Sequence, residues 1–252
     1  LYGRDYFGLK GQASAGSYRN YARSHKYDAD SRRLDFRLIA ANAGDLRGKR
    51  VLEIGCGLGS LLAVFLSHGC DCMGIELSPR AAEEARRRLG VPVLEQPLET
   101  AAVGGFDVVV AVSVIEHVAK PGVFLDAAAG ALTDGGLLWL WTPNWRCAEV
   151  HGQDWVYWRG DLEHLCYFSP EVLVAACRER GLALVCEGSS GPSATRKGRQ
   201  RRTGIKRLKE FVKDIPVLGP VLLNLKRTAL PERLAPVNTA FADYAGVFRK
   251  VA

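Results

Sequence analysis

The sequence predicts an α/β fold with a doubly wound, mostly parallel sheet. Three observations predict it. Short apolar runs alternate with segments of helical periodicity through residues 46–189. A glycine-rich turn at residues 55–59 joins the first apolar run to the first helical segment. Gly and Pro separate most of the later runs, so strands and helices are expected to follow one another as crossover units.

Composition fits one such domain with additions. The chain has 252 residues, and its hydrophobic content of 48% is enough for a full core. We expect an aromatic-rich cap over residues 1–45, a core over 46–189 and 237–252, and a basic helical insertion over 190–236. No apolar span is long enough to cross a bilayer and no signal-peptide pattern starts the chain, so a cytoplasmic protein is expected, in peripheral contact with a membrane if the insertion binds lipid.

The first core element is a buried strand, residues 51–54, which ends in the glycines Gly55, Gly57 and Gly59. Glycines let the backbone pass close to a ligand, because a Cβ would occupy that space. A dinucleotide fingerprint would need a sixth-position glycine, where this chain has Ser60. The turn therefore predicts a nucleotide-type ligand other than a dinucleotide.

The second strand, residues 71–77, contains Glu76 near its end. A carboxylate at this place, one strand after the glycine turn, suits a grip on two ribose hydroxyls. Ser78 then predicts a helix N-cap and Gly90 a helix stop. The third strand is expected at Val91 to Glu95.

The remaining elements follow in the same alternation. The fourth strand starts at Phe106, and a helix is predicted over residues 120–133. The fifth strand ends near Asn144. A further helix is predicted over residues 170–180, with Ser169 as its N-cap, and the sixth strand follows at Leu182 to Glu187.

This ordered set resembles the class I S-adenosylmethionine (SAM) methyltransferases, and most closely the subgroup with the ubiquinone-biosynthesis O-methyltransferases. The motifs are the acidic-x-G-x-G-x-G turn from Glu53, Glu76 itself, the run Ser113 to His117, and the end of the fifth strand. The resemblance covers residues 46–190 and resumes at 241–251. It implies SAM as the cofactor, and a seven-stranded sheet whose last strand is antiparallel. The cofactor-binding residues that it implies or suggests are Glu53, Gly55, Cys56, Gly57, Gly59, Glu76, Leu77, Gln96, Pro97, Leu98, Ser113 and, from the cap, Tyr21.

The family resemblance also bears on whether this chain binds a metal ion. In the ubiquinone O-methyltransferases a Glu-x-x-Glu-His motif after the fourth strand binds a divalent metal. This chain has Ser113 in place of the first carboxylate, and keeps Glu116 and His117. Because hard cations such as Mg²⁺ need several oxygen ligands, we predict no catalytic metal.

Three histidines are candidate general bases for an acceptor hydroxyl. His117 follows the fourth strand, and imidazole accepts a proton near neutral pH. His164 lies in a run, residues 163–170, that resembles a segment near the acceptor pocket of glycan and natural-product methyltransferases. His151 is a weaker third. Packing of His117 against the cofactor, without proton transfer, is the alternative.

All five tryptophans fall within residues 139–158. Trp139 and Trp141 are expected in the core of the fifth strand. The other three are expected in a loop that either lines the acceptor site or packs over the sheet: Trp145, Trp155 and Trp158. In the cap, Tyr18, Tyr21 and His25 either line the site or pack on the sheet edge.

The net charge of +7 is concentrated in the insertion, where residues 196–213 hold nine Lys or Arg and one acid. Apolar residues recur at helical spacing from Ile205, and the segment 205–225 becomes increasingly apolar. It is open to two interpretations: a lid or homodimer contact, or an anionic membrane surface bound through residues 196–225. Nucleic acid is not expected as a partner, because no RNA-binding appendage is recognisable.

The seven cysteines lack the spacing of a disulfide framework, so reduced structural thiols are expected, including Cys70 and Cys72.

The leading interpretation of the chain is a SAM-dependent O-methyltransferase of a small-molecule or carrier-linked acceptor: a sugar, a phenol or a carboxylate. The alternatives are N- or C-methylation, and a non-catalytic SAM-fold module that binds a partner or RNA.

Overall fold

The computed structural model describes residues 35–157, 163–193, 237 and 241–251. Some sequence-based predictions fall outside these residues. They are the cap residues Tyr18, Tyr21 and His25, the loop residue Trp158, and the basic segment 196–225.

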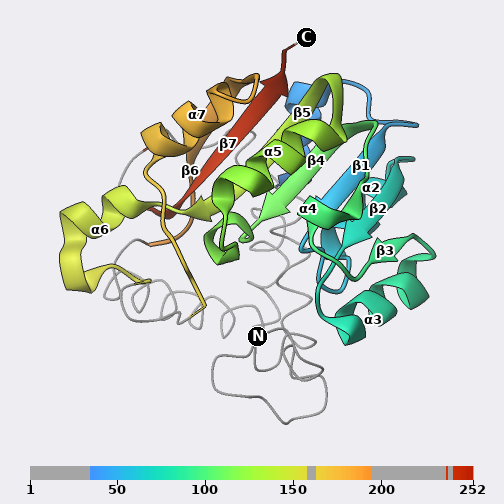
Figure 1. The fold of residues 1–252 in the computed structure, drawn as a ribbon, viewed down its shortest axis with the longest axis horizontal. Helices are drawn as coiled ribbons and strands as arrows, with labels where there is room; N and C mark the ends of the chain where they lie inside the picture. The colour runs from blue at the N-terminus through green and yellow to red at the C-terminus, as the bar shows by residue number, and fades with distance from the viewer. Residues whose placement is uncertain (1–34, 158–162, 194–236, 238–240, 252) are drawn as a thin grey trace, which may run out of the picture.

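Seven strands form one sheet in the order β3-β2-β1-β4-β5-β7-β6 (Figure 1). Its five parallel members come first in the chain, and β7 pairs antiparallel with both β5 and β6. The predicted fold class is therefore confirmed, with the last strand inserted between β5 and β6. The strands are β1 (Arg50–Ile54), β2 (Asp71–Ile75), β3 (Val93–Leu94), β4 (Phe106–Val112), β5 (Leu132–Pro143), β6 (Leu182–Ser193) and β7 (Phe241–Lys250).

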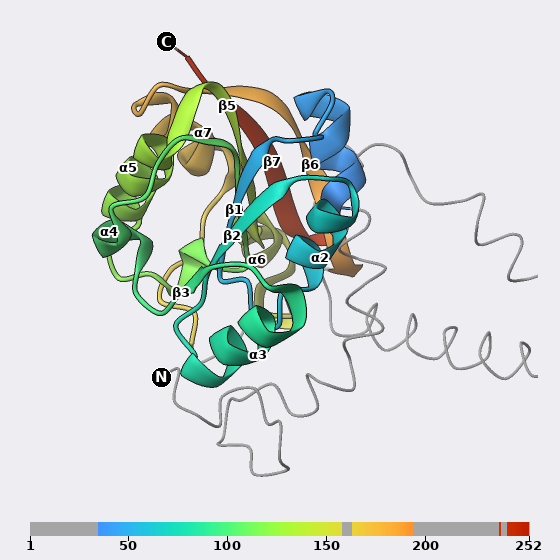
Figure 2. The same ribbon diagram turned by 90° about the vertical axis from the view of Figure 1, so that its right-hand side faces the viewer.

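Helices cover both faces of the sheet, which Figure 2 shows from its edge. A helix over residues 35–43 packs with two others on one face: α2 (Ser60–Ser67) and α3 (Pro79–Leu89). The opposite face carries α4 (Leu98–Ala101), α5 (Pro121–Ala131) and α7 (Pro170–Arg178). The short helices η1 (Ile115–His117), α6 (Trp145–His151) and η2 (Gly152–Asp154) lie in the loops that follow β4 and β5.

Alternation along β4 shows how this layering arises from sequence. Val108 and Val110 are buried in the core on the α2 and α3 face, whereas Val109 and Ala111 are buried in the core on the α5 and α7 face. Successive side chains of a strand point to opposite faces, so a continuous apolar run serves two cores at once. This explains why the central strands read as unbroken apolar runs.

Several local predictions are confirmed by hydrogen bonds. The Ser78 hydroxyl accepts from the backbone N–H of Ala81 and begins α3, and the Ser169 hydroxyl accepts from Val172 and begins α7. Gly90 ends α3 with a left-handed φ of 68°. These signals are encoded within three residues of the feature that they specify.

Some boundaries differ from the sequence-based expectation. The third strand is two residues long rather than five, because this edge strand has only β2 as a neighbour. Strand β6 runs on to Ser193 instead of ending near 187, since β7 offers pairing as far as Phe241. Residues 145–151 form α6 where a loop was expected, with Asn144 as the N-cap.

The chain order around β1 places the site. From β1 the chain moves outward to β2 and β3, then returns to β4 on the other side of β1. In doubly wound sheets ligands bind beyond the carboxyl ends of the strands at such a reversal.

Among the described residues, no helix is both long and apolar enough to cross a membrane.

Candidate functional site

The glycine turn after β1 is shaped by its backbone. Gly55 has a φ of 69°, and a Cβ there would lie 2.7 Å from the Val114 side chain, so a larger residue would be both strained and crowded. The backbone N–H groups of Gly55 and Cys56 both donate to the carbonyl of Ile75, at 2.8 and 3.0 Å. The turn is thus tied to β2 and lies against the segment that follows β4.

Glu76 lies at the end of β2, where the sequence places a ribose ligand. Its carboxylate is buried and accepts hydrogen bonds from the backbone N–H of Gly57, at 2.8 Å, and of Ser78, at 2.7 Å. Burial raises the pKa of this carboxyl group, and the hydrogen bonds that it accepts oppose the rise. Glu76 therefore joins the glycine turn to the start of α3.

Glu53 has a role that the sequence reasoning missed. This buried carboxylate accepts a hydrogen bond of 3.1 Å from the backbone N–H of Leu62, the third residue of α2. Because the first N–H groups of a helix lack partners within the helix, Glu53 serves as a cap for α2. No local signal marks this role, because Glu53 and Leu62 are 9 positions apart and meet only when α2 packs back over β1.

The other cofactor candidates are placed differently. Leu77 is 39% exposed beside Glu76, and Gln96 and Pro97 are also exposed. Leu98 is buried in the core on the α5 face, and Cys56 is buried in the turn. These positions allow direct ligand contact for the first three side chains.

Ser113 follows β4 with a φ of 54°, a left-handed backbone conformation that non-glycine residues rarely adopt. Its N–H donates to the carbonyl of Trp141 at the end of β5. Backbone strain of this kind is typical of functional sites, because the surrounding structure has to hold it.

The residues that the sequence predicts for the acceptor side gather around Glu116 on η1. Its side chain is fully buried, and its carboxylate accepts a 2.9 Å hydrogen bond from the Thr142 hydroxyl on β5. Its backbone carbonyl accepts from the N–H groups of Leu165 and Cys166, at 2.8 and 3.2 Å. Glu116 thereby fixes the loop of residues 163–168 beside the end of β4.

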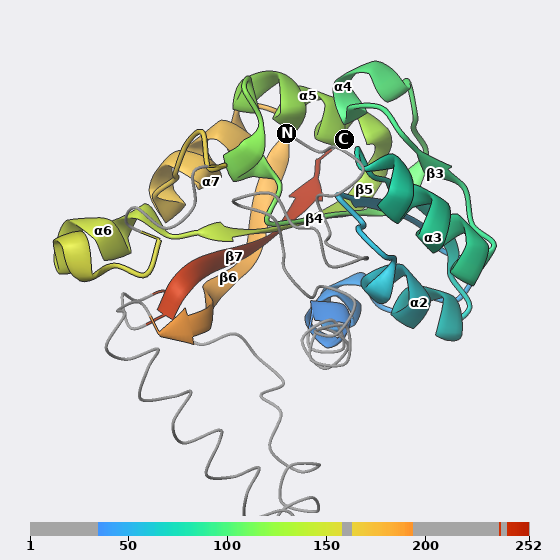
Figure 3. The ribbon, with the colours of Figure 1, turned by 90° about the horizontal axis from the view of Figure 1, so that it is seen from below.

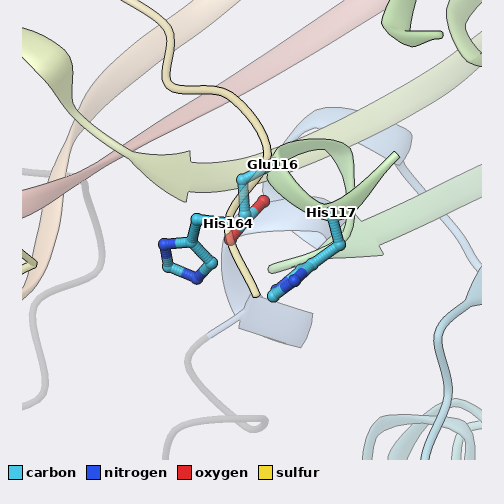
Figure 4. A group of neighbouring side chains, drawn as sticks. All are labelled: Glu116, His117 and His164. Atoms are coloured by element: carbon cyan, nitrogen blue, oxygen red, sulfur yellow. The ribbon is translucent and has the colours of Figure 1, made fainter. Parts of the chain in front are cut away.

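That loop brings His164 against His117 (Figure 4). The two imidazole rings have centroids 4.7 Å apart and meet edge to face, at an interplanar angle of 74°. Burial, and then the neighbouring His117, lower the pKa of His164 to about 4. Sequence reasoning identified both histidines, but it could not predict their contact, because 46 residues separate them.

A family model described as a methyltransferase domain matches residues 23–187. This match covers more than half of the chain, and the site geometry above accords with it. The chain belongs to the methyltransferase domain family. Its fold is that of the class I SAM-dependent methyltransferases, a class whose cofactor is SAM.

The curated relatives of this methyltransferase include the ubiquinone biosynthesis O-methyltransferase of Bordetella avium. It is 31% identical over 157 residues, which are 56% of this chain and 64% of that relative. The similarity therefore spans less than two thirds of the relative's length.

Solved structures show the same fold at low sequence identity. One is the methyltransferase in a complex with the Haloferax volcanii Trm112 activator, with a TM-score of 0.60, 14% identity, and coverage of 92% of this chain and 96% of that one. Another is the [4+2]-cyclase SpnF, with a TM-score of 0.60, 19% identity, and coverage of 89% and 82%.

The remaining base candidate of this methyltransferase lies elsewhere. His151 is the last residue of α6, and it is outside the cluster that His117 and His164 form with Glu116. In Figures 1 and 3, α6 and α3 lie beyond opposite edges of the sheet.

Part of the tryptophan-rich segment packs in the interior of the protein. Trp139 and Trp155 are fully buried, and Trp155 packs with Cys147, Ala148 and Val156 in a small separate core. Tyr167 joins this core to the histidine pair. It lies 5.0 Å from the Trp155 ring and 5.3 Å from the His164 ring, measured between centroids. The Trp155 side chain therefore supports the loop instead of meeting an acceptor.

Proposed function

We propose that this methyltransferase transfers the methyl group of SAM to an oxygen atom of a small-molecule or carrier-linked acceptor: a sugar, a phenol or a carboxylate. Glu76 would hold the ribose hydroxyls, and the glycine turn would lie under the methionine part of the cofactor. The Val114 side chain lies 2.7 Å from the position that a Cβ on Gly55 would take, so the glycine turn lies beside the residues that follow β4, and this supports the assignment.

The observation that carries the proposal is the histidine pair at the acceptor side. A hydroxyl acceptor has to lose its proton as the methyl group moves in line from sulfur to oxygen. The Nδ1 atom of His117 lies 3.1 Å from the carbonyl oxygen of Glu163, so Nδ1 carries a hydrogen and Nε2 has the lone pair of the neutral ring. We propose His117 as the base and His164 as its neighbour.

The names of the curated relatives support oxygen as the acceptor atom, because they are O-methyltransferases of ubiquinone biosynthesis. N- or C-methylation is the competing reaction class, and it needs less proton chemistry. A membrane contact through residues 196–225, and a lid or homodimer contact through residues 205–225, stay predictions.

The test is methyl transfer from isotope-labelled SAM to a panel of phenols, sugars and carboxylates, with the product analysed by mass spectrometry. We expect the label on oxygen. Replacement His117→Ala should slow turnover by roughly 10²–10⁴-fold, the usual contribution of a general base, while SAM binding is unchanged. The matched control is His68→Ala, which should leave turnover unchanged. His68 is an exposed histidine at the C-terminal end of α2.

Two results would overturn the proposal. A label found on nitrogen or carbon would reject the O-methyl assignment. Wild-type turnover in both His117→Ala and His164→Ala would remove the histidines from the mechanism.

A further inference from the structure

The last turn of α3 contains three consecutive arginines, and one of them reaches the glycine turn. Any basic residue at this place balances the partial negative charge at the C-terminal end of a helix. Arg86 also donates to a carbonyl of β3, and Arg87 pairs with a glutamate within α3. The Nη1 atom of Arg88 instead donates to the carbonyl oxygen of Leu58, at 3.0 Å, across 30 positions of the chain.

This contact helps to fix one peptide unit of the glycine turn from both sides. The C=O and N–H groups of a trans peptide point in opposite directions. In the peptide between Leu58 and Gly59, the C=O group accepts from Arg88, and the N–H group donates to the carbonyl of Cys56, at 2.8 Å. Rotation of this peptide would therefore break both hydrogen bonds.

The same end of α3 also packs against the turn. Gly59 has a φ of 75°, and a Cβ there would collide with the Leu89 side chain and lie 3.5 Å from the Cβ of Ala85. Leu58 is buried beside it. At the other end of α3, Glu76 accepts from the N–H groups of Gly57 and of the Ser78 cap. Both ends of the helix therefore contact the turn.

Contacts from α3 matter because the turn is rich in glycine. Gly55, Gly57 and Gly59 all have positive φ, and glycine has more conformational freedom to lose than any other residue. A segment that is already held in its bound shape loses less of this freedom when a ligand binds. The hydrogen bond from Arg88 should therefore lower the cost of binding a ligand on the turn.

We propose that Arg88 is a positioning residue for SAM, and that it acts through the peptide between Leu58 and Gly59. The proposal rests on the function proposed above only where that function places the methionine part of SAM on the glycine turn. It does not depend on oxygen as the acceptor atom, because N- and C-methylation would use the same cofactor. The effect of Arg88 should be larger for ligands that contain the amino-acid part of SAM than for ligands that lack it.

The experiment measures binding of two ligands to the full chain by calorimetry. S-adenosylhomocysteine contains the amino-acid part, and adenosine lacks it. Arg88→Ala should weaken the binding of S-adenosylhomocysteine by roughly threefold to tenfold, the range that one net hydrogen bond gives. The same variant should bind adenosine nearly as the wild type does. A purely structural role of Arg88 would not change the ratio of the two affinities.

Arg87→Ala is the matched control. It removes the same charge from the same helical turn, where Arg87 pairs with Glu84, and it leaves the contact between Arg88 and Leu58 in place. This variant should bind both ligands as the wild type does, and circular dichroism shows whether each variant keeps the fold.

Two results would overturn the role of Arg88 alone. One is wild-type affinity for S-adenosylhomocysteine in Arg88→Ala. The other is an equal loss of affinity for both ligands, which would indicate general damage to α3. If the wild-type protein itself did not bind S-adenosylhomocysteine, the proposed cofactor site would be rejected, and the role of Arg88 with it.

Discussion

Two buried glutamates beside the glycine turn have different roles, although both are acidic residues near the end of a strand. Glu53 accepts from Leu62 and caps α2, whereas Glu76 accepts from Gly57 and Ser78 and is the residue that we propose as the ribose ligand. The sequence predicted the position of Glu76, because it depends on a short strand and the turn before it. The capping role of Glu53 depends on how α2 returns over β1, which no local pattern shows.

The raised pKa of Glu76 predicts an acid limit for cofactor binding. The ribose hydroxyls donate to the ionised carboxylate, so affinity for SAM should fall as the pH drops through this pKa. Because burial raises the pKa, the loss should begin at a higher pH than an ordinary glutamate would give. Calorimetry across a pH series measures it.

The control for this pH series is Glu76→Gln, whose weaker affinity should be nearly independent of pH over the same range. A wild-type affinity that stays constant down to the ordinary range of a glutamate pKa would contradict the account of Glu76.

At the scale of elements, the helix caps were predictable and the acceptor-side loops were not. Ser78 and Ser169 signal their helices locally. The 163–168 loop is held by the carbonyl of Glu116 and by a bridge between Asn144 and Phe168, contacts between residues at least 24 positions apart. The sequence therefore identified His117 and His164 singly, and only the fold brings them together.

The glycine turn gives a prediction at this scale. Gly55→Ala should destabilise the protein and weaken SAM binding, because φ is 69° and the new Cβ would crowd the Val114 side chain. A cost of about 1–2 kcal/mol is expected from the left-handed backbone alone. Thermal unfolding and calorimetry with SAM measure the two effects.

The same substitution in α5 is the matched control. Gly130 has an ordinary φ, and no atom lies within 4 Å of the Cβ that alanine would add. Gly130→Ala should raise stability by about 0.5–1 kcal/mol. If both alanines changed stability alike, the strain argument for Gly55 would fail.

At the scale of the whole molecule, one sheet supports two cores, and the late strand β7 contributes to both. Ala245 and Val247 pack on the face of α2, and Tyr244 and Phe248 on the face of α5. Strand β7 follows a long basic insertion, yet it lies between β5 and β6. The family resemblance implied this pairing, whereas the apolar pattern alone predicted only a strand.

Shortening a buried side chain of β7 should therefore destabilise the whole domain. Phe248 is fully buried, and Phe248→Ala should cost about 3–5 kcal/mol of unfolding free energy. Val185 on β6 is 42% exposed, and Val185→Ala should change it by less than about 0.5 kcal/mol. Denaturant unfolding of both variants makes the comparison, and similar losses would show that β7 does not anchor the core.

The fold identifies the class of site, but it does not determine the reaction. A protein of the same fold is named a [4+2]-cyclase, at 19% identity. The assignment of this chain to SAM chemistry depends on its family and on the donor residues, and Glu76 and the glycine turn are the residues that test it.

Calorimetric titration of SAM into the wild-type chain and Glu76→Ala tests this assignment most directly. The wild type should bind one equivalent in the micromolar range. The variant should lose roughly tenfold to a hundredfold in affinity or more, since a hydrogen bond to a charged group contributes about 1.5–3 kcal/mol. Exposed Glu83→Ala on α3 should bind as the wild type does. No measurable SAM binding by the folded wild-type protein, or equal affinity in Glu76→Ala, would contradict the account.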